Sequence, residues 1–521
     1  MNRAVFGGVV LAALALALTF RLARADVRPM HHDEANQAVK FGELLETGDY
    51  RYDRNDHHGP TLYYLTLPAA WARGQATLAS LDERTLRAVP ALFGAGLILL
   101  LIPLARGLGR TAAAASALLL AVSPVLTFYG RFYIQESLFA FFALAFLVAM
   151  GRFAEHPRGA AAAWAGIFAG LAYSTKETSL IVLPAAVAAA SLARAVTPTA
   201  AADGKADRPV AAKTWGAYAA VAAASAVAIA FVFYSSFFKY PGGLIESFGA
   251  FGIYLDRGVG AGPHAEPFLY YARLLAYSSS GGLVWTEGLV LILACAGIVA
   301  AFRRPPGAVS AFWPRYVALY SVFAFVAFSA IRYKTPWNLI PFYVGLVIMA
   351  GVGAAAIVGA RAWRLWRVFV AGALLAATFQ LGWQSWRASF RYPADPRNPY
   401  VYAQTVPDFL RLTRRVFDIA ELRADRLAVP VKVIAGPYEQ WPLPWYLRGL
   451  SRVGYWTSAG DAGRLDDAPI VIAAQDQAGA VGAALGDRYV QESYGLRPDV
   501  ILTLYVERTL WDRFLATRAG R

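Results

Sequence analysis

The chain has 521 residues, of which 58% are hydrophobic and only 16% are charged. Soluble domains carry about 25% charged residues, so this composition excludes a soluble globular protein, a disordered chain and a coiled coil. The net charge of +15 is typical of a membrane protein with Lys and Arg in its cytoplasmic loops, which is a better explanation than nucleic-acid binding. The single cysteine, Cys295, excludes an intrachain disulfide.

Apolar stretches that approach the length of a membrane-spanning helix, about 20 residues, recur along most of the chain. We expect about eleven transmembrane helices, near residues 4–20, 87–105, 112–129, 137–150, 160–174, 178–194, 215–238, 283–302, 312–331, 337–359 and 368–386. The polar residues 174–178 separate the fifth helix from the sixth, because Lys176 and Glu177 would be costly at the centre of a bilayer. The pattern predicts a polytopic α-helical membrane protein.

Basic residues in the short connections predict which ends of these helices face the cytoplasm. Alternate connections contain Arg106 and Arg110, Arg152 and Arg158, Arg194, Arg303 and Arg304, and Arg361, Arg364 and Arg367. We expect these connections in the cytoplasm and the intervening loops outside an inner (plasma) membrane. Residues 1–25 also resemble a cleavable signal peptide. We favour a retained first helix, and both interpretations place Asp33 outside.

Two segments are not expected to cross the membrane. Residues 21–84 form a long first outer loop of the transmembrane domain, which we expect to cover residues 1–386. Residues 387–521 contain short β-like runs (431-VKVIA, 469-PIVIAA and 501-ILTLYV) between helical or turn-rich stretches. This pattern predicts a small extracytoplasmic α/β domain.

Acidic residues gather at the predicted outer ends of the helices. Asp33 and Glu34 follow the first span closely, and Glu136 begins the fourth. A carboxylate at the membrane surface can act as a general base that removes a proton from a hydroxyl attacking a sugar carbon. A second carboxylate can then steer the acceptor or bind a metal. The simpler interpretations, that Asp33 caps the following helix and that Glu136 interacts with a helix dipole, stay open.

Basic residues lie at the same outer ends. Lys176, Arg131 and Lys334 are placed to neutralise a phosphate at the boundary between water and lipid. Departure of a phosphate from a sugar needs such positive charge. For any one of them, snorkelling toward the lipid headgroups is the simpler explanation. Lys334 is the most unusual, because Lys-Thr-Pro-Trp (334–337) interrupts the chain between two spans.

Four of the six histidines lie in the first outer loop, as the pairs His31-His32 and His57-His58. Side chains of adjacent residues diverge, so this spacing matches a divalent metal site such as zinc only weakly. A metal site that includes His31, His32 and His57 stays open, while solvated or hydrogen-bonded histidines are the favoured interpretation. The chain has no Walker A loop and no H-E-x-x-H motif.

The order of these motifs resembles that of a known family. The motifs are the acidic pair 33–34, Pro-Thr-Leu-Tyr-Tyr (60–64), Ser-Pro (123–124), Arg131 with Glu136, and Gly-Leu-Ala…Lys-Glu (170–177). This order resembles the GT-C membrane glycosyltransferases, in particular the protein O-mannosyltransferase and aminoarabinose-transferase-like group. Tyr-Lys-Thr-Pro-Trp (333–337) and Trp-Pro-Leu-Pro-Trp-Tyr-Leu-Arg (441–448) resemble the bacterial and archaeal flippase activity-associated subfamily more closely.

The resemblance implies a GT-C-like fold and an enzyme that takes a sugar from a polyprenyl-phosphate donor on the outer face of the membrane. It implies that Asp33 is the catalytic base, with Glu34 beside it, and that Glu136 is a second catalytic acid. It also implies that Lys176 and Lys334 contact the phosphate of the donor.

Further contacts follow from the same resemblance. Relatives often have a basic residue directly before Pro-Pro-Leu, where this chain has His-His-Gly-Pro (57–60). We therefore expect His58 to substitute for that phosphate contact. Contacts to the acceptor or the sugar are expected from Glu177, Tyr63 and Trp337. Relatives of this type often need no metal, so metal dependence stays open.

We therefore predict a membrane glycosyltransferase that moves a sugar from a polyprenyl-phosphate donor to a hydroxyl of a protein, lipid or glycan acceptor. Its partners are the lipid bilayer, the donor and the acceptor, and not nucleic acid. Two alternatives stay open: a lipid or glycan transporter, and a non-catalytic partner of a glycan assembly pathway. Transporters place polar groups near the bilayer midplane, often in repeated halves. This sequence has its polar groups at the outer edge, so the enzyme is the preferred prediction.

Overall fold

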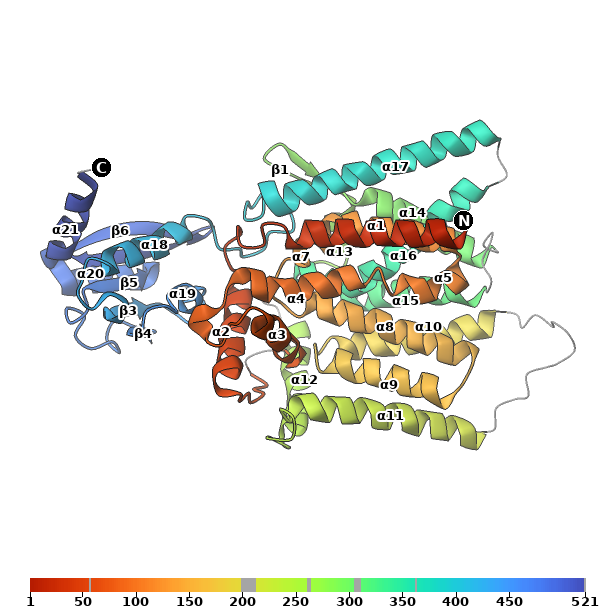
Figure 1. The fold of residues 1–521 in the computed structure, drawn as a ribbon, viewed down its shortest axis with the longest axis horizontal. Coiled ribbons are helices and arrows are strands. Elements are labelled where there is room, and N and C mark those ends of the chain that lie inside the picture. The colour runs from red at the N-terminus through yellow and green to blue at the C-terminus, as the bar shows by residue number, and fades with distance from the viewer. Residues whose placement is uncertain (56–57, 198–211, 260–263, 304–310, 361–362, 520–521) are drawn as a thin grey trace, which may run out of the picture.

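The computed structural model describes residues 1–55, 58–197, 212–259, 264–303, 311–360 and 363–519, which form two parts (Figure 1). Long apolar helices lie side by side in a membrane part, and a five-stranded sheet with its helices forms a sheet part. The helices of the bundle are α1 (Arg3–Leu22), α4 (Glu83–Gly96), α5 (Leu101–Leu108), α6 (Arg110–Val122), α8 (Glu136–Glu155), α9 (Gly159–Tyr173), α10 (Ser179–Val196), α11 (Ala212–Tyr234), α14 (Gly288–Phe302), α15 (Phe312–Ala330), α16 (Ile340–Gly359) and α17 (Arg364–Trp386).

Eight helical stretches in the described residues are long and apolar enough to cross a membrane. One of them, Glu83–Leu108, runs through α4 and α5. The other three expected spans correspond to the shorter apolar helices α6, α9 and α14, so each expected span has a helix. The expected span 112–129 is interrupted, because Ser123 caps a new helix, α7 (Pro124–Tyr129), whose first residue is proline.

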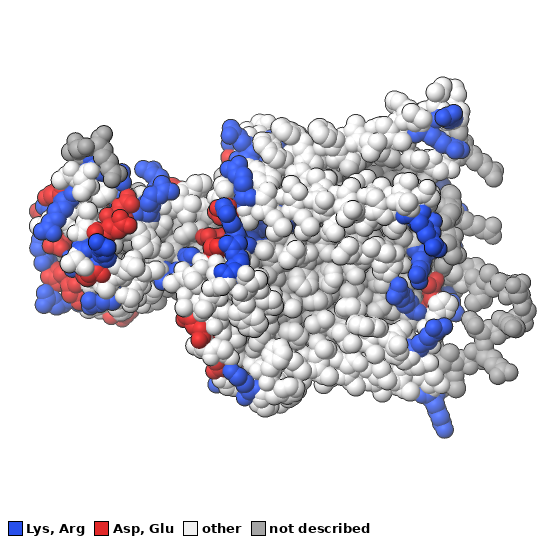
Figure 2. Space-filling model, viewed as in Figure 1, with Lys and Arg blue, Asp and Glu red and all other residues white. Residues whose placement is uncertain are grey.

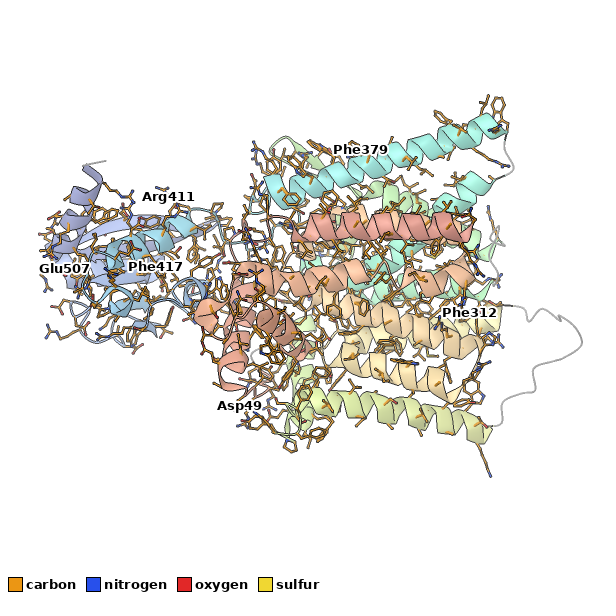
Figure 3. The ribbon with its side chains drawn as sticks, in the orientation of Figure 1. Asp49, Phe312, Phe379, Arg411, Phe417 and Glu507 are labelled. Carbon is orange, nitrogen blue, oxygen red and sulfur yellow. The ribbon has the colours of Figure 1, made fainter. Side chains whose placement is uncertain are left out.

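Small residues let the helices of the membrane part pack closely. Where α14 meets α16, a Cβ atom on Gly297 would stand 1.9 Å from the carbonyl oxygen of Met349. Edge helices behave differently, since only 6% of the apolar stretch of α11 and of α17 is buried in the protein. Phe379 on α17, for example, is 78% exposed (Figure 3). Such apolar faces are those that lipid covers.

The other elements of the membrane part gather at the end of the bundle that faces the sheet part (Figure 1). They are α2 (His32–Thr47), α3 (Thr61–Ala72), the 3₁₀-helix η1 (Leu78–Ser80), α7, α12 (Gly243–Val259), α13 (Tyr270–Ala276), the hairpin of β1 (Ser278–Ser280) and β2 (Leu283–Trp285), the 3₁₀-helix η2 (Pro336–Leu339) and the π-helix η3 (Arg387–Arg391). The first outer loop expected from the sequence contributes α2, α3 and η1. This end of the bundle carries the expected site residues.

The sheet part has the strand order β4-β3-β5-β7-β6. Its elements are α18 (Phe409–Ala420), η4 (Arg426–Ala428), β3 (Val431–Ile434), α19 (Leu443–Tyr446), β4 (Val453–Trp456), β5 (Ile470–Ala474), α20 (Gln475–Leu485), η5 (Gly486–Arg488), β6 (Tyr489–Arg497), β7 (Val500–Glu507) and α21 (Arg508–Ala519). β3 is parallel to β4 and β5, and β7 is antiparallel to β5 and β6. The three predicted strands are confirmed as β3, β5 and β7. β4 and β6 are half-buried edge strands without a continuous apolar run, so they lack that signal.

α19 attaches the sheet part to the membrane part. Trp445 is fully buried, and its indole N–H donates to Glu83 Oε1 over 2.9 Å. The guanidinium of Arg448 lies 3.7 Å above the Trp445 ring. The hydroxyl of Tyr446 accepts a hydrogen bond from the backbone N–H of Met30, also over 2.9 Å. These contacts hold the sheet part next to the start of α2.

Candidate functional site

Asp33 lies in the first turn of α2, and its side chain is 36% exposed. The alternative that Asp33 caps this helix is wrong, because His31 is the cap. His31 Nδ1 accepts from the backbone N–H of Asp33 over 3.1 Å, and Glu34 accepts from the backbone N–H of His31 over 2.9 Å. This reciprocal cap fixes the backbone at Asp33 and leaves its carboxylate accessible.

Glu34, the next residue, is fully buried between two arginines. Its carboxylate forms ion pairs with Arg28 and Arg87, each at 2.8 Å, and accepts from the backbone N–H of Tyr133. Burial opposes ionisation of Glu34, but the two guanidinium groups outweigh it and hold the pKa of this carboxyl well below its usual range. Glu34 is therefore no base near neutral pH. The geometry gives it a structural role in place of the expected catalytic one, and it anchors the turn that carries Asp33.

Glu136 and Lys176 form a buried ion pair. Lys176 Nζ donates to Glu136 Oε1 and, over 2.9 Å, to Asn338 Oδ1. Glu136 begins α8, while Lys176 lies in the connection between α9 and α10. The other carboxylate oxygen, Glu136 Oε2, has no hydrogen-bond partner among the described residues. The pair thus offers a cation and an unused acceptor to a ligand.

The short helix η2 connects this pair with the turn of Asp33. The ring of Trp337, in η2, has its centroid 5.7, 5.5 and 5.8 Å from the ring centroids of His31, Tyr402 and Tyr129. The next residue, Asn338, is the one that binds Lys176. The turn that carries Asp33 and the pair of Glu136 and Lys176 are therefore both next to η2.

Two expected phosphate contacts are held by backbone carbonyls. Arg131 donates to the carbonyls of residues 20, 21, 23 and 24 over 2.7–3.1 Å and so closes the end of α1. Burial, with neighbouring arginines, lowers the pKa of Arg131 to about 9. Lys334 Nζ donates to the carbonyls of Glu266 and Ile331, and burial lowers its pKa. The geometry gives Arg131 a structural role, and a phosphate contact from Lys334 stays a prediction.

His58 lies against the connection 174–178. Its Nδ1 atom is 2.6 Å from Glu177 Oε2. Burial opposes ionisation of Glu177, but His58 outweighs it and the pKa of Glu177 is lowered. Gly59 permits the close approach, because a Cβ atom there would stand 2.1 Å from the carbonyl oxygen of Ser174. The structure thus places His58 on the connection that carries the buried lysine.

The expected contacts to acceptor or sugar differ in accessibility. Trp337 is partly exposed, and the Glu177 side chain is 5% exposed. Tyr63 is fully buried, and its hydroxyl donates to Gln37 Oε1. A role of Tyr63 in holding α3 against α2 fits this burial better than the expected contact with an acceptor.

The histidine pair His31-His32 diverges, as its spacing implies. His31 Nε2 is 3.0 Å from the carbonyl oxygen of Tyr402, whereas the His32 ring stacks at 6.1 Å on Tyr438. His57 lies outside the described residues. No group of three His, Cys, Asp or Glu residues that could hold a metal ion occurs within the described ranges. The geometry of His31 and His32 therefore does not support a metal shared by this pair.

Three residues border the site without a sequence motif of their own: Asn338, Tyr402 and His264. The hydroxyl of Tyr402 is hydrogen-bonded to His264 Nδ1. Burial, Tyr333 and Asp33 raise the pKa of Tyr402 to about 12, so the phenol is protonated at neutral pH. In the sequence, only the position of Asn338 directly after the motif 333–337 could have indicated a residue of the site.

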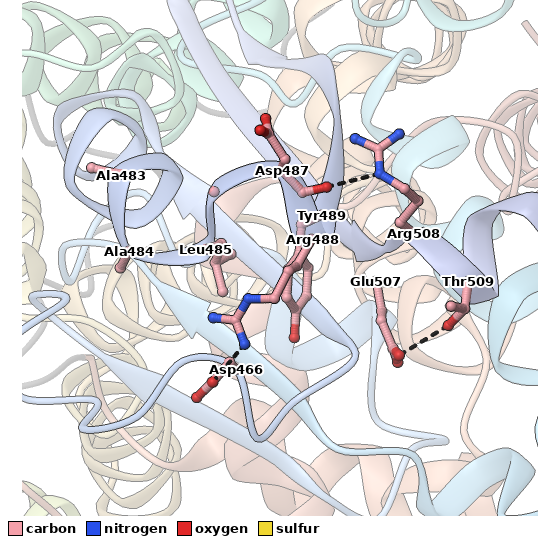
Figure 4. Close-up of a pocket in the computed structure, with 11 residues that line it drawn as sticks. Asp466, Ala483, Ala484, Leu485, Asp487, Arg488, Tyr489, Glu507, Arg508 and Thr509 are labelled. Atoms are coloured by element: carbon pink, nitrogen blue, oxygen red, sulfur yellow. Dashed lines mark hydrogen bonds and ion pairs between the residues drawn. The ribbon is translucent and has the colours of Figure 1, made fainter.

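A separate pocket of about 630 Å³ lies in the sheet part, at the end of α20 and the start of α21 (Figure 4). Its charged groups bind one another. Arg488 pairs with Asp466 at 2.9 Å, and Arg508 Nε donates to the carbonyl of Asp487 over 2.8 Å. None of the expected site residues lines this pocket, so it is not part of the candidate site.

Comparison with known proteins agrees with this architecture. Residues 66–201 match the family described as dolichyl-phosphate-mannose-protein mannosyltransferase, and no curated protein sequence matches the chain. ArnT from Cupriavidus metallidurans, solved bound to undecaprenyl phosphate, is 18% identical, with a TM-score of 0.61 over 95% of this chain and 98% of that one. The oligosaccharyltransferase AglB from Archaeoglobus fulgidus, solved with an inhibitory peptide and a dolichol-phosphate, is 14% identical, with a TM-score of 0.60 over 97% of this chain and 74% of that one. The chain has the expected GT-C fold of the ArnT type and is a multi-pass membrane protein.

Proposed function

We propose that this protein is a membrane glycosyltransferase that moves a sugar from a polyprenyl-phosphate donor to a hydroxyl of its acceptor. The observation that carries the proposal is that an accessible carboxylate, Asp33, and the buried pair of Lys176 and Glu136 lie at the same end of a GT-C-type bundle, where η2 contacts both His31 and Lys176. Two proteins of similar fold were solved with polyprenyl phosphates, namely undecaprenyl phosphate in ArnT and dolichol-phosphate in AglB.

In the proposed reaction the acceptor hydroxyl attacks the sugar carbon bonded to the phosphate, with inversion at that carbon. Asp33 accepts the hydroxyl proton as the new carbon–oxygen bond forms. The bond between the sugar carbon and the phosphate oxygen breaks, and the lipid phosphate leaves with the electron pair. The Lys176 ammonium stabilises the negative charge that develops there. Glu136 holds Lys176 in place and steers the acceptor through its unused oxygen.

Other predicted contacts complete the proposed site. His58 and Lys334 are further contacts for the donor phosphate. Trp337, whose ring packs against His31, Tyr402 and Tyr129, and Glu177 contact the sugar or the acceptor. The proposed acceptor is a protein, a lipid or a glycan, and the proposed domains are a transmembrane domain of residues 1–386 and an extracytoplasmic domain of residues 387–521.

The distribution of charge supports an active site on the outer face of an inner (plasma) membrane. Lys and Arg dominate the bundle end that lies away from the sheet part, whereas both signs of charge occur at the other end (Figure 2). The basic residues at the far end include Arg3, Arg106, Arg110, Arg152, Arg158, Arg194, Lys213, Arg303, Arg364 and Arg367. By the positive-inside rule, that end is cytoplasmic, and the candidate site and the sheet part are extracytoplasmic.

Turnover by purified protein with a panel of polyprenyl-phosphate sugars tests this function, with release of lipid phosphate as the measurement. Replacing Asp33→Asn removes the base, and we expect transfer to fall by about a hundredfold or more. Asp26→Asn is the matched control, because Asp26 lies in the same loop, is 38% exposed and pairs with Arg84 at the surface. Full activity of the Asp33→Asn protein would contradict the proposed role.

A further inference from the structure

The connection that carries Lys176 also carries buried polar atoms that lack hydrogen bonds. Ser174 Oγ and Glu177 Oε1 have no hydrogen-bond partner among the described residues, and the same holds for Ser179 Oγ at the start of α10. Buried polar groups in folded proteins are nearly always paired. Three unpaired atoms within six residues therefore indicate a place where a ligand or water supplies the missing partners.

Tyr52 adds a fourth such atom from another part of the chain. Its side chain is 2% exposed, and its hydroxyl has no partner within the part of the chain that the structure describes. Burial raises the pKa of Tyr52, and the carboxylate of Glu177 raises it further. The hydroxyl of Tyr234 donates over 3.1 Å to the carbonyl oxygen of Tyr173, the residue directly before Ser174. The Tyr52 ring is held edge-on against Tyr234, with centroids 4.8 Å apart.

A surface pocket opens at Tyr52. It has a volume of about 670 Å³ and is lined by residues 51–55 and Glu246 of α12. This volume is in the range of small-molecule sites, about 300–1,000 Å³. Tyr52 thus belongs both to the wall of an open pocket and to the buried polar group around Glu177.

We infer that Glu177 and Tyr52 bind hydroxyl or amino groups of the donor sugar, and that they select a neutral or amino sugar over a uronic acid. A carboxylate oxygen and a phenol without partners are suited to sugar hydroxyls, since the first accepts and the second donates and accepts hydrogen bonds. A uronic acid would place a second carboxylate beside the buried Glu177, where like charges repel strongly.

The adjacency of Lys176 and Glu177 in the chain indicates that the sugar bound here is the one carried by the donor. Lys176, the proposed contact of the donor phosphate, is the residue directly before Glu177, and adjacent Cα atoms lie about 3.8 Å apart. The sugar of the donor is bonded directly to that phosphate, so its hydroxyl groups fall within reach of the same connection. The inference therefore rests on the proposed function and specifies its substrate class.

The test compares two donors that differ only at the sixth carbon, polyprenyl-phosphate glucose and polyprenyl-phosphate glucuronic acid. For the unaltered protein we expect kcat/KM for the glucose donor to exceed that for the glucuronic acid donor at least tenfold. In Glu177→Gln this ratio should fall several-fold. The ratio is the informative quantity, because loss of the pair with His58 affects both donors alike. Asp418→Asn in the sheet part, where the carboxylate is 35% exposed and pairs with Arg518 at the surface, is the control and should keep the original ratio.

Tyr52→Phe supplies a second measurement. It removes one hydroxyl and keeps the ring contact with Tyr234, so we expect a three- to tenfold higher KM for the glucose donor and an unchanged KM for the acceptor. A higher KM for the acceptor alone would assign the pocket to the acceptor and overturn the inference. Equal use of both donors by the unaltered protein would also overturn it, while leaving the proposed function intact.

The two proposals fail separately. If no donor is turned over, the proposed function fails, and binding of the two donors then tests the pocket directly. Thermal stabilisation of the purified protein should be greater with the glucose donor, and this difference should shrink in Glu177→Gln. Equal stabilisation by both donors would overturn the inference.

Discussion

Asp33 and Glu34 are adjacent in the chain, and both are acids at the start of α2, yet the fold places them in opposite environments. The side chain of Asp33 is 36% exposed, whereas that of Glu34 is fully buried against Arg28 and Arg87. A general base must be accessible to its substrate, whereas a carboxylate that anchors the backbone through ion pairs is buried. The proposed division of roles, with Asp33 as the base and Glu34 as the anchor, therefore follows from which carboxylate the arginines contact.

Replacing Glu34→Gln should destabilise the protein, since two buried guanidinium groups lose their counter-charge at a cost of about 3–5 kcal/mol. The folded-state pKa of Glu34 lies below its usual value of 4.5, so its ionised form stabilises the fold above that pH. This stabilisation is lost as the pH falls below about 4.5. We expect the variant to have a lower Tm than the unaltered protein in detergent at pH 7. We expect this difference in Tm to become smaller as the pH is lowered. A difference that stays constant down to pH 3.5 would contradict this account.

At the scale of elements, the site depends on how loops dock on helix ends. The start of α3 reaches the end of α9 through Gly59, and Thr61 N donates to the carbonyl oxygen of Ser174 over 3.2 Å. The threonine hydroxyls 61 and 175 are also hydrogen-bonded, over 2.7 Å. This docking brings His58 to Glu177 and fixes the connection that carries Lys176.

Gly59→Ala tests that docking. Its Cβ atom would stand 2.1 Å from the carbonyl oxygen of Ser174, which is backbone and cannot move independently. We expect a loss of about 1–3 kcal/mol in stability, as for other overpacked sites, together with a raised KM for the donor. The control is Gly216→Ala in α11, where an added Cβ atom meets nothing within 4 Å. Unchanged donor kinetics in Gly59→Ala would show that the docking is irrelevant to the site.

At the scale of the whole molecule, the proposed chemistry needs the sheet part and the candidate site on the same, outer side of the membrane. The sheet part is held beside α2 by Trp445, whose indole binds Glu83. Both therefore share one side of the membrane. The charge distribution in Figure 2 indicates which side that is.

Labelling of single cysteines in intact cells with a membrane-impermeant maleimide tests the orientation. The natural Cys295 is first replaced by serine. We expect rapid labelling of Tyr438→Cys, a position that is 69% exposed in the sheet part, and labelling of Arg158→Cys only after the membrane is permeabilised. Both positions keep an accessible side chain, so each serves as a control for the other. The reverse pattern would place the site in the cytoplasm.

Composition and short-range pattern determined much of this protein. Apolar stretches of sufficient length predict the helices and their order, because a helix in a bilayer satisfies its backbone internally and depends only on its own residues. The strands β3, β5 and β7 were likewise predictable from buried apolar runs. The motifs around Asp33 and Lys176 indicated both the fold and the end of the bundle where the site lies.

Tertiary structure alone decided what each polar residue does there. Lys176 pairs with Glu136, 40 residues earlier, and with Asn338, 162 residues later, while Glu34 pairs with Arg87 across 53 residues. No local pattern encodes such partners, because they depend on which helix ends the packing of the bundle brings together. The same packing left the side chain of Asp33 36% exposed, buried that of Glu34, and left Glu177 Oε1 and the Tyr52 hydroxyl buried without a hydrogen-bond partner among the described residues.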